Sequence, residues 1–152
     1  MKPEKSLRDI DGQQFMRSFQ VNALVTAIIA RDFLPLLRHP GPSCLATLSA
    51  KVGSIADNQL GGWYAYRASK AALNMIIKNA SLEYQRRSSK ARVLAIHPGT
   101  TITELSKPYI ARTKLKLHST DETASNILSV IDGRPLSDSG LFLSWDGSTL
   151  PW

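Results

Sequence analysis

The run Ser43-Cys-Leu-Ala-Thr-Leu-Ser49 is short and apolar, and the turn-forming Pro40-Gly-Pro42 precedes it. The run Ala91-Arg-Val-Leu-Ala-Ile-His97 has the same character and ends at Pro98-Gly99. Leu141-Phe-Leu-Ser144 is a third run of this kind. Short continuous apolar runs between turn signals are typical of strands that are buried on both faces, as in a parallel sheet. The sequence therefore predicts three buried strands.

A long helix is expected before the first of these strands, from Asp11 to about Leu37. Either Asp11 or Gly12 is a suitable start, and Pro35 marks the end because proline interrupts a helix. After Val21 the segment is apolar on most sides, so we expect much of it to be buried.

Two further helices are expected between and after the strands. The segment from Trp63 to about Arg87 carries small and apolar residues at helical spacing, namely Ala68, Ala71, Ala72, Met75 and Ile76. The segment 121–130 can form another helix, with Thr120 or Asp121 as its N-cap. Alternating helices and strands indicate an α/β fold of three layers, part of a doubly wound, Rossmann-like parallel sheet that is covered on both faces.

The composition limits the class of protein. A chain of 152 residues predicts one domain, 1–152, and its charged fraction of 20% is that of a globular protein. No apolar run reaches the roughly 18 residues that a membrane helix needs, so we expect no membrane-spanning segment. Residues 1–14 lack a signal-peptide core. The single cysteine, Cys44, cannot form an internal disulfide, which favours the reducing cytoplasm. No second histidine lies at metal-ligand spacing from His97, so we expect no metal.

The net charge of +7 favours anionic partners in general. The basic residues are scattered, with two small clusters, Arg86, Arg87, Lys90 and Arg92, and then Lys107, Arg112, Lys114 and Lys116. Neither cluster alternates with aromatic residues, so we expect no nucleic-acid partner and no membrane. The irregular segment 106–119 either faces an anionic group of a substrate or forms a solvated lid.

Tyr66 and Lys70 are the side chains best suited to chemistry. A spacing of i to i+4 places both on one face of the predicted helix. A lysine ammonium close to a phenol favours the phenolate and lowers the tyrosine pKa from about 10. We therefore expect Tyr66 to act as a general acid or base near neutral pH.

Several motifs around this pair resemble the short-chain dehydrogenase/reductase family, and within it the carbonyl-reductase-like subgroup that includes a bacterial cell-contact signalling factor (C-factor). The resemblance runs from about residue 7 to the C-terminus. Beside Tyr66-Arg-Ala-Ser-Lys70 it is carried by Ser49-Ala-Lys-Val-Gly-Ser-Ile55, Asp57-Asn-Gln-Leu-Gly-Gly-Trp-Tyr64, His97-Pro-Gly99, Leu105-Ser-Lys-Pro108 and Trp145-Asp-Gly-Ser148.

The resemblance implies an oxidoreductase that interconverts a carbonyl and an alcohol with NADP or NAD. Tyr66 would exchange a proton with the substrate oxygen, and Lys70 would hold the nicotinamide ribose and lower the pKa of Tyr66. Asn22 would anchor a water molecule in the proton relay. Pro98 and Gly99 would form the wall beside the nicotinamide, and the carboxamide contacts of the family fall on Thr101 and Thr103.

The catalytic serine is where this sequence departs from the family pattern. The family has two adjacent serines before the glycine, and the second of them is catalytic. Here Ser49 is followed by Ala50, so alanine occupies the expected position. Either Ser49 or Ser54 could supply the hydroxyl group, and Ser49 is the preferred candidate.

The family fold also begins with a strand and a glycine-rich turn that approaches the pyrophosphate, and this chain has no such motif. A late start codon, a truncated gene and a real short form would each explain this difference. Hydride must come from a cofactor, since no side chain supplies it. The alternative function is therefore a non-catalytic partner of full-length homologues. The resemblance also implies a homo-oligomer formed through the two long helices.

Overall fold

The computed structural model describes residues 3–87, 90–104, 106–111, 113 and 115–152. Its main sheet has three parallel strands in the order β1-β2-β5, which are Ser43–Leu48, Ala91–His97 and Phe142–Ser144. All three are the strands predicted from the sequence, and β2 lies in the middle. Leu48 pairs with Ile96, and His97 pairs with Ser144, so the carboxyl ends of the strands meet at one edge of the sheet.

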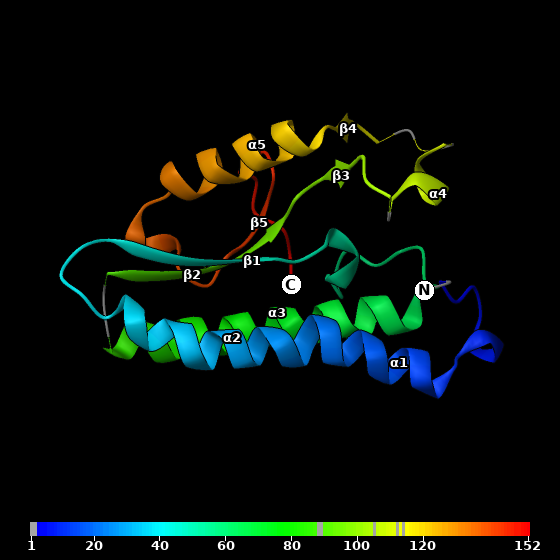
Figure 1. The fold of residues 1–152 in the computed structure, drawn as a ribbon, viewed down its shortest axis with the longest axis horizontal. Coiled ribbons are helices and arrows are strands. Elements are labelled where there is room, and N and C mark those ends of the chain that lie inside the picture. Colours follow the sequence, from blue (N-terminus) through cyan, green and yellow to red (C-terminus); the bar gives the residue numbers. More distant parts are fainter. Residues whose placement is uncertain (1–2, 88–89, 105, 112, 114) are drawn as a thin grey trace.

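Helices cover the sheet on both faces and complete three layers (Figure 1). Helix α5 (Thr120–Asp132) lies on one face, and α1 (Gly12–Phe19), α2 (Val25–Phe33) and α3 (Tyr64–Arg87) lie on the other. Alternate residues of the strands point to the two faces, so there are two apolar cores. Val93 and Ala95 face α2 and α3, whereas Leu94 and Ile96 face α5. The α/β architecture predicted from the sequence is thus present.

The long N-terminal helix is not regular along its length. It begins where the sequence predicted, since the Asp11 side chain accepts a hydrogen bond from the Gln14 amide. A π-helical turn, Gln20–Leu24, joins α1 to α2, and a 3-10 turn, Leu34–Leu37, ends the segment at Pro35. Such π turns are rare and occur often at functional sites.

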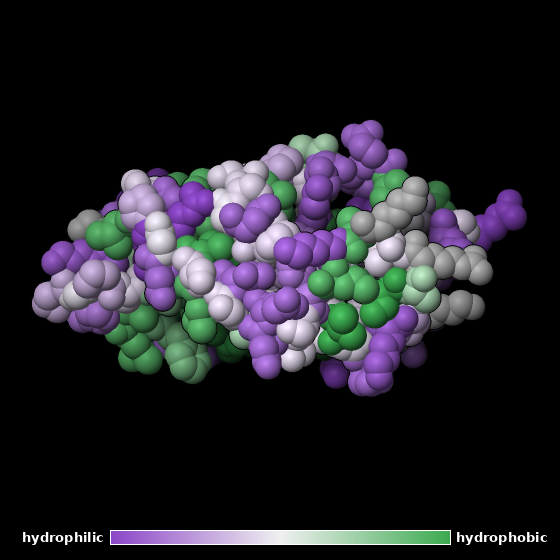
Figure 2. Space-filling model, turned by 90° about the horizontal axis from the view of Figure 1, so that it is seen from above, coloured by the Kyte–Doolittle hydropathy of each residue, from purple (hydrophilic) through white to green (hydrophobic). Residues whose placement is uncertain are grey.

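The expected burial of this segment after Val21 was wrong. Helices α1 and α2 contact α3 with only a narrow stripe, in which Ala23, Thr26, Ala30 and Leu34 are buried. Seven other large apolar side chains of the segment are exposed, namely Met16, Val21, Leu24, Val25, Ile28, Ile29 and Phe33. We call this set the α1–α2 apolar face. In the view from above, apolar surface forms patches at the lower left and right of centre, and polar surface covers much of the rest (Figure 2).

The same segment corrects the expectation about membrane spans. Taken as one helix, Gly12–Leu37 has 26 residues and a mean hydropathy of 1.3 in its most apolar window, which is long and apolar enough to cross a membrane. Core helices of soluble proteins and signal sequences pass the same test, so this property alone assigns no membrane role.

Short elements shape the segment between β2 and α5. Strand β3 (Thr100–Thr101) pairs in parallel with β4 (Leu117–His118), and the single turn α4 (Lys107–Ile110) lies between them. Leu105, Arg112 and Lys114, which belong to the sequence motifs and the second basic cluster, lie outside the described residues. The N-cap of α5 is Ser119 rather than Thr120 or Asp121, the two predicted caps, and it forms a capping box with Glu122.

The two outer edges of the sheet differ. The C-terminal tail folds back along β5, where Ser148 O accepts from Ser144 N at 2.8 Å and Leu150 N donates to Phe142 O at 2.7 Å. Leu143 and Thr149 form an antiparallel bridge between these bonds. At the other edge, β1 pairs with β2 alone within the described part of the chain. The edge of β5 is therefore covered and the edge of β1 is bare.

Candidate functional site

Tyr66 and Lys70 lie on the first two turns of α3, beneath the carboxyl ends of the strands. The Lys70 ammonium is 5.9 Å from the centre of the Tyr66 ring, so the predicted common face is present. Lys70 is only 9% exposed, and its Nζ donates a hydrogen bond of 2.9 Å to the carbonyl oxygen of Leu48. The last residue of β1 thus fixes where the ammonium lies.

Gly53 allows the loop after β1 to pack directly on this turn of α3. A Cβ atom at position 53 would lie 2.7 Å from Lys70 Cβ and 2.9 Å from the Lys70 carbonyl carbon. Both distances are shorter than any real contact, and one of the atoms is backbone. Only glycine fits between this loop and the lysine.

The electrostatics of the pair differ from the sequence-based expectation. Burial raises the pKa of Tyr66 above its usual value, whereas a lowered pKa was predicted. Burial also lowers the pKa of Lys70, because removal of water disfavours the ammonium. The ammonium is directed to the Leu48 carbonyl rather than to the phenol, so desolvation dominates at Tyr66. In this state the phenol is a proton donor.

Asn22 is connected to the same helical turn through Ser69. Asn22 lies in the π-helical turn and donates from Nδ2 to Ser69 Oγ at 2.9 Å. Ser69 Oγ in turn donates to the carbonyl oxygen of Tyr66 at 2.9 Å. The Asn22 carbonyl oxygen accepts from Thr26 Oγ1 at 2.7 Å. Ser69 was not singled out from the sequence, although it is fully buried and lies between Tyr66 and Lys70.

Both candidate serines have partners within the protein. Ser49 is 3% exposed, and its hydroxyl donates to Asn74 Oδ1 on α3 at 2.5 Å. Ser54 is 2% exposed, donates to the carbonyl oxygen of Trp152 at 3.3 Å and accepts from the Asp57 amide. Each hydroxyl thus directs its proton to a protein group. The structure gives neither serine an advantage, and Ser49 stays a prediction.

The segment after β2 brings the other predicted residues to the same edge of the sheet. Gly99 has φ of 78°, and a Cβ there would lie 2.9 Å from Trp145 Cδ1. Thr101 Oγ1 is 2.9 Å from Thr123 Oγ1, and the Thr103 amide donates to Ser106 Oγ. These contacts fix the path of the loop and involve the threonine residues in local hydrogen bonds. Pro98 lies half-buried directly before Gly99.

An aromatic wall stands beside Tyr66. Trp63 was expected close to the site, whereas its contact with Tyr109 was not predicted. Trp63 contacts Tyr66 edge-on, with ring centres 6.0 Å apart, and contacts Tyr109 in the same way at 5.1 Å. Tyr109 comes from α4, 43 residues further along the chain, so no local pattern could have revealed it. Trp63 has φ of 53°, a left-handed conformation that is uncommon for a non-glycine residue.

Four buried side-chain polar atoms of the described residues have no hydrogen-bond partner, and two of them lie near the carboxyl ends of the strands. Within the described part of the chain, the buried Asn74 Nδ2 and His97 Nδ1 atoms have no hydrogen-bond partner. Burial, aided by repulsion from Lys51 and opposed by Asp146, lowers the pKa of His97 to about 4. The imidazole is therefore neutral at physiological pH. No group of three His, Cys, Asp or Glu side chains among residues that the structure describes could hold a metal ion.

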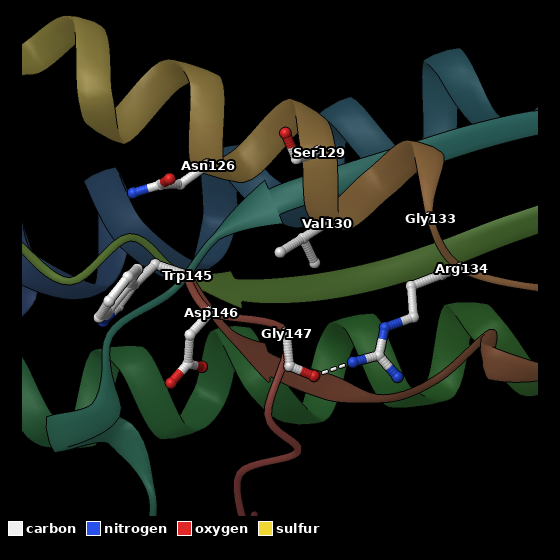
Figure 3. A pocket seen from close by; sticks show the side chains of 8 residues that line it. All are labelled: Asn126, Ser129, Val130, Gly133, Arg134, Trp145, Asp146 and Gly147. Atoms are coloured by element: carbon white, nitrogen blue, oxygen red, sulfur yellow. Dashed lines mark hydrogen bonds between the residues drawn. The ribbon is translucent and has the colours of Figure 1, made fainter.

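Two hollows lie away from Tyr66. One, of about 350 Å³, lies between α5 and the turn after β5, and Figure 3 shows the Arg134 guanidinium directed to the Gly147 carbonyl oxygen in its wall. Asn126 and Ser129 face it from α5. The other, of about 380 Å³, lies between α2 and α3 and is lined by Ala30, Leu34 and Tyr84, among others. Neither contains a residue of the predicted site.

Comparison with known proteins assigns the class of the chain. Residues 1–114 match the family model for short chain dehydrogenases. The chain therefore belongs to the short-chain dehydrogenase/reductase family. The C-signal protein of Myxococcus xanthus is 34% identical over 97% of this chain and 84% of its own length. A 1-hydroxy-2-glutathionyl-2-methyl-3-butene dehydrogenase of Rhodococcus is 32% identical over 94% of this chain and 61% of its own.

Solved structures give the same result for the fold. The carbonyl reductase Sniffer of Drosophila melanogaster matches the whole chain with a TM-score of 0.85 and 26% identity, and the chain covers 62% of it. The NADPH-bound carbonyl reductase from chicken fatty liver matches equally well, with 60% of its chain covered. The chain thus resembles carbonyl reductases and the C-signal type. Apart from C-signal, it spans about 60% of the length of these relatives.

Proposed function

We propose that the protein is the catalytic part of an oxidoreductase that interconverts a carbonyl and an alcohol with NADP or NAD. The observation that carries this proposal is the placement of Tyr66 and Lys70 on adjacent turns of α3, at the carboxyl ends of the strands. Ligands of open α/β sheets bind at this edge. The link from Asn22 through Ser69 to the Tyr66 turn supports the same function.

The nicotinamide end of such a cofactor fits the residues present. Lys70 Nζ has three N–H donors, and Leu48 O accepts one of them. The remaining donors are free to hold two ribose hydroxyl groups. When bound, the cofactor supplies or accepts hydride. Pro98, Gly99, Thr101 and Thr103 line the same edge and would border the nicotinamide ring.

Tyr66 would donate its phenolic proton to the substrate oxygen as the carbonyl is reduced, and accept a proton in the reverse direction. The raised pKa keeps the proton on the phenol until the substrate oxygen develops negative charge. Ser49 and Asn22 would position the carbonyl and a relay water. Trp63 and Tyr109 would form an apolar wall for the substrate. Proton transfer of this kind contributes roughly 10²- to 10⁴-fold to a rate.

Titration of the purified chain with NADPH and NADH tests the proposal, with energy transfer from tryptophan to nicotinamide as the signal. Trp63 is a suitable donor because it contacts Tyr66. We expect Lys70→Met to weaken binding. Lys78→Met is the matched control, because Lys78 lies on the same helix and donates to Gly140 O far from the site. Equal loss in both variants, or no binding to the folded chain, would count against cofactor binding by this chain alone.

Turnover is tested with Tyr66→Phe in whatever assembly binds the cofactor. The variant should retain cofactor affinity and lose carbonyl reduction. An unchanged rate would remove Tyr66 from the mechanism. We propose the cytoplasm as the compartment of this protein, because its single cysteine, Cys44, cannot form an internal disulfide.

A second candidate function, association with copies of this chain or with full-length homologues, is favoured by the α1–α2 apolar face. Single exposed apolar residues are ordinary, but a continuous set along two helices marks an interaction surface. Analytical ultracentrifugation should show a dimer that Ile28→Glu dissociates. Leu60→Glu, in an exposed loop on another part of the surface, should leave the dimer intact. A monomer at micromolar concentration would contradict this role.

A further inference from the structure

Three polar side chains form a row across the carboxyl ends of the main strands. Ser49 N donates to Ile96 O at 2.8 Å, so the register of β1 and β2 continues by one residue and places Ser49 beside His97. His97 pairs in turn with Ser144 of β5. We call Ser49, His97 and Ser144 the polar row.

The polar row faces α3. Ala95 and Phe142 belong to the apolar core that α3 covers. Side chains two residues apart along a strand share a face, so His97 and Ser144 face α3 as well. Ser144 is only 7% exposed. The core beneath α3 therefore ends, at this edge of the sheet, in a layer of buried polar groups, and such groups need hydrogen-bond partners.

Asn74 of α3 lies against this row. It is four residues after Lys70 on the same helix, and it is 3% exposed. Its Oδ1 accepts the proton of Ser49 Oγ at 2.5 Å. Its Nδ2 is buried and has no partner among the residues that the structure describes, although an amide nitrogen carries two N–H donors. Burial of a donor without a partner is destabilising.

His97 carries a second unpartnered atom in the same layer. Its Nδ1 is buried and forms no hydrogen bond within the described part of the chain. Burial lowers the pKa of His97 to about 4, so the imidazole is neutral near pH 7. One ring nitrogen of a neutral imidazole is an acceptor. A donor on α3 and an acceptor on β2 are thus both left over, and they do not bond to each other.

Water is the ligand whose chemistry satisfies both atoms. A water molecule accepts from one group and donates to another, and buried waters form about three hydrogen bonds to polar groups that are otherwise unsatisfied. It would accept from Asn74 Nδ2 and donate to His97 Nδ1. The hydroxyl oxygens of Ser49 and Ser144 are acceptors for its second hydrogen atom. A cation does not suit the Asn74 donor, and an anion does not suit the imidazole acceptor.

We propose that Asn74 and His97 hold a buried water molecule at the carboxyl ends of the strands, and that Asn74 is the positioning residue of the Ser49 hydroxyl. This site differs from the relay water expected at Asn22, because Asn22 contacts Ser69 on an earlier turn of α3. The site rests on the hydrogen-bond pattern and is independent of the proposed function. A direct Asn74–His97 bond, formed by a small shift of both side chains, is the competing arrangement.

The water allows the Asn74 amide two orientations. A half-turn of the amide exchanges Nδ2 and Oδ1, and water can donate to the oxygen as well as accept from the nitrogen. In the observed orientation Ser49 Oγ donates into the protein. In the turned orientation Ser49 Oγ accepts from Nδ2, and its own proton is available to a substrate oxygen. This consequence, unlike the site itself, rests on the proposed function.

NMR measurement of water contacts in the isotope-labelled full chain tests the site. We expect cross-peaks between water and the Asn74 Nδ2 protons, with NOE and ROE of opposite sign, as for a water that stays bound longer than the molecule takes to tumble. The amide of Asn79, exposed on the same helix, is the internal control and should show no such pair. Ser49→Ala should keep the cross-peaks, which excludes transfer through the Ser49 hydroxyl proton. His97→Phe should lose them.

Two further signals test the partners of Asn74. The nitrogen spectrum of His97 should show the proton on Nε2 and a hydrogen-bonded acceptor at Nδ1. In Asn74→Leu the Nδ1 signal should shift to the value of an unbonded nitrogen. The Ser49 hydroxyl proton should exchange slowly in the unmodified chain, and its signal should be lost in Asn74→Leu. Asn79→Leu is the matched control and should keep both signals.

Several results would overturn the proposal. The absence of a long-lived water at Asn74 in the unmodified chain would do so, and so would a proton on His97 Nδ1 or loss of the cross-peaks in Ser49→Ala. If His97→Phe or Asn74→Leu does not fold, the spectra of the unmodified chain decide the question. The NADPH titration is separate, because a chain that binds this water and no cofactor keeps the water site and rejects the proposed function.

Discussion

Gly53 is the residue that allows the loop after β1 to touch α3 at Lys70. An added methyl group would meet Lys70 Cβ at 2.7 Å and a backbone carbon at 2.9 Å. Overpacking of this kind forces backbone shifts that cost about 1–3 kcal/mol. The position of the Lys70 ammonium therefore depends on Gly53, a residue without a reactive side chain.

We expect Gly53→Ala to lower the free energy of unfolding by about 1–3 kcal/mol and to weaken cofactor affinity. Gly12→Ala is the control, because a Cβ there would have nothing within 4 Å. Urea unfolding of both variants measures the difference. If both variants were equally stable, the loop after β1 would be able to shift without a cost in free energy.

His97 makes the stability depend on pH. The folded pKa of about 4 lies below the ordinary value of 6.5 because the imidazole is buried. Neutral His97 therefore stabilises the fold above about pH 6.5, and this contribution is lost as the pH falls through 4. The difference between the folded and the ordinary pKa of His97 corresponds to at most about 3 kcal/mol of unfolding free energy.

Unfolding of His97→Gln in urea should change less between pH 7 and pH 4.5 than unfolding of the unmodified chain. If His97→Gln showed the same pH slope as the unmodified chain, another group would be responsible.

At the scale of single elements, the start of α5 shows which local signals can be read in advance. Ser119 accepts from the Glu122 amide at 3.1 Å, and Glu122 Oε2 accepts from the Ser119 amide at 2.7 Å. The Ser-Thr-Asp-Glu pattern of this capping box was present in the sequence, although the cap was predicted at Thr120 or Asp121. The reciprocal pair decides the start of the helix.

Loss of an N-cap costs about 1 kcal/mol. We expect Ser119→Ala to reduce the free energy of unfolding by about that amount, and Thr120→Ala, one residue further into α5, to have a much smaller effect. Chemical unfolding followed by circular dichroism compares them. A larger loss of stability in Thr120→Ala would indicate that Thr120 is the N-cap, as the sequence predicted.

The strands and helices could be predicted because their signals are local. Apolar runs between turns identified the three strands of the main sheet, whereas β3 and β4 lie in a segment that was expected to be irregular. Helical spacing identified α3 with Tyr66 and Lys70 on one face. The burial of α1 and α2 could not be predicted, since it depends on what packs against them. Tyr109 and the Leu48 carbonyl reach the site from distant segments, and desolvation, which reverses the expected pKa shift of Tyr66, exists only in the folded chain.

At the scale of the whole molecule, the C-terminal tail connects several layers. Trp152 stacks on Phe142 of β5 at 5.5 Å, and its carbonyl oxygen accepts from the Ala56 amide and from Ser54 Oγ. Lys78 of α3 lies 5.9 Å over the same ring. The tail thus joins β5, α3 and the loop after β1.

We expect Trp152→Ala to destabilise the fold by about 2 kcal/mol, because much of an aromatic packing contact is lost. Pro151→Ala, at an exposed position beside it, should be nearly neutral. Thermal unfolding with light scattering measures both stability and aggregation. Early aggregation of Trp152→Ala would show that the tail also shields the β5 edge.

The difference between the two sheet edges limits how the protein can assemble. A molecule that adds strands at both edges can grow without end into a fibre. Here the C-terminal tail occupies the edge of β5, so a further strand cannot pair with β5. The main sheet therefore cannot extend in that direction, and the tail prevents its growth into a fibre through both edges.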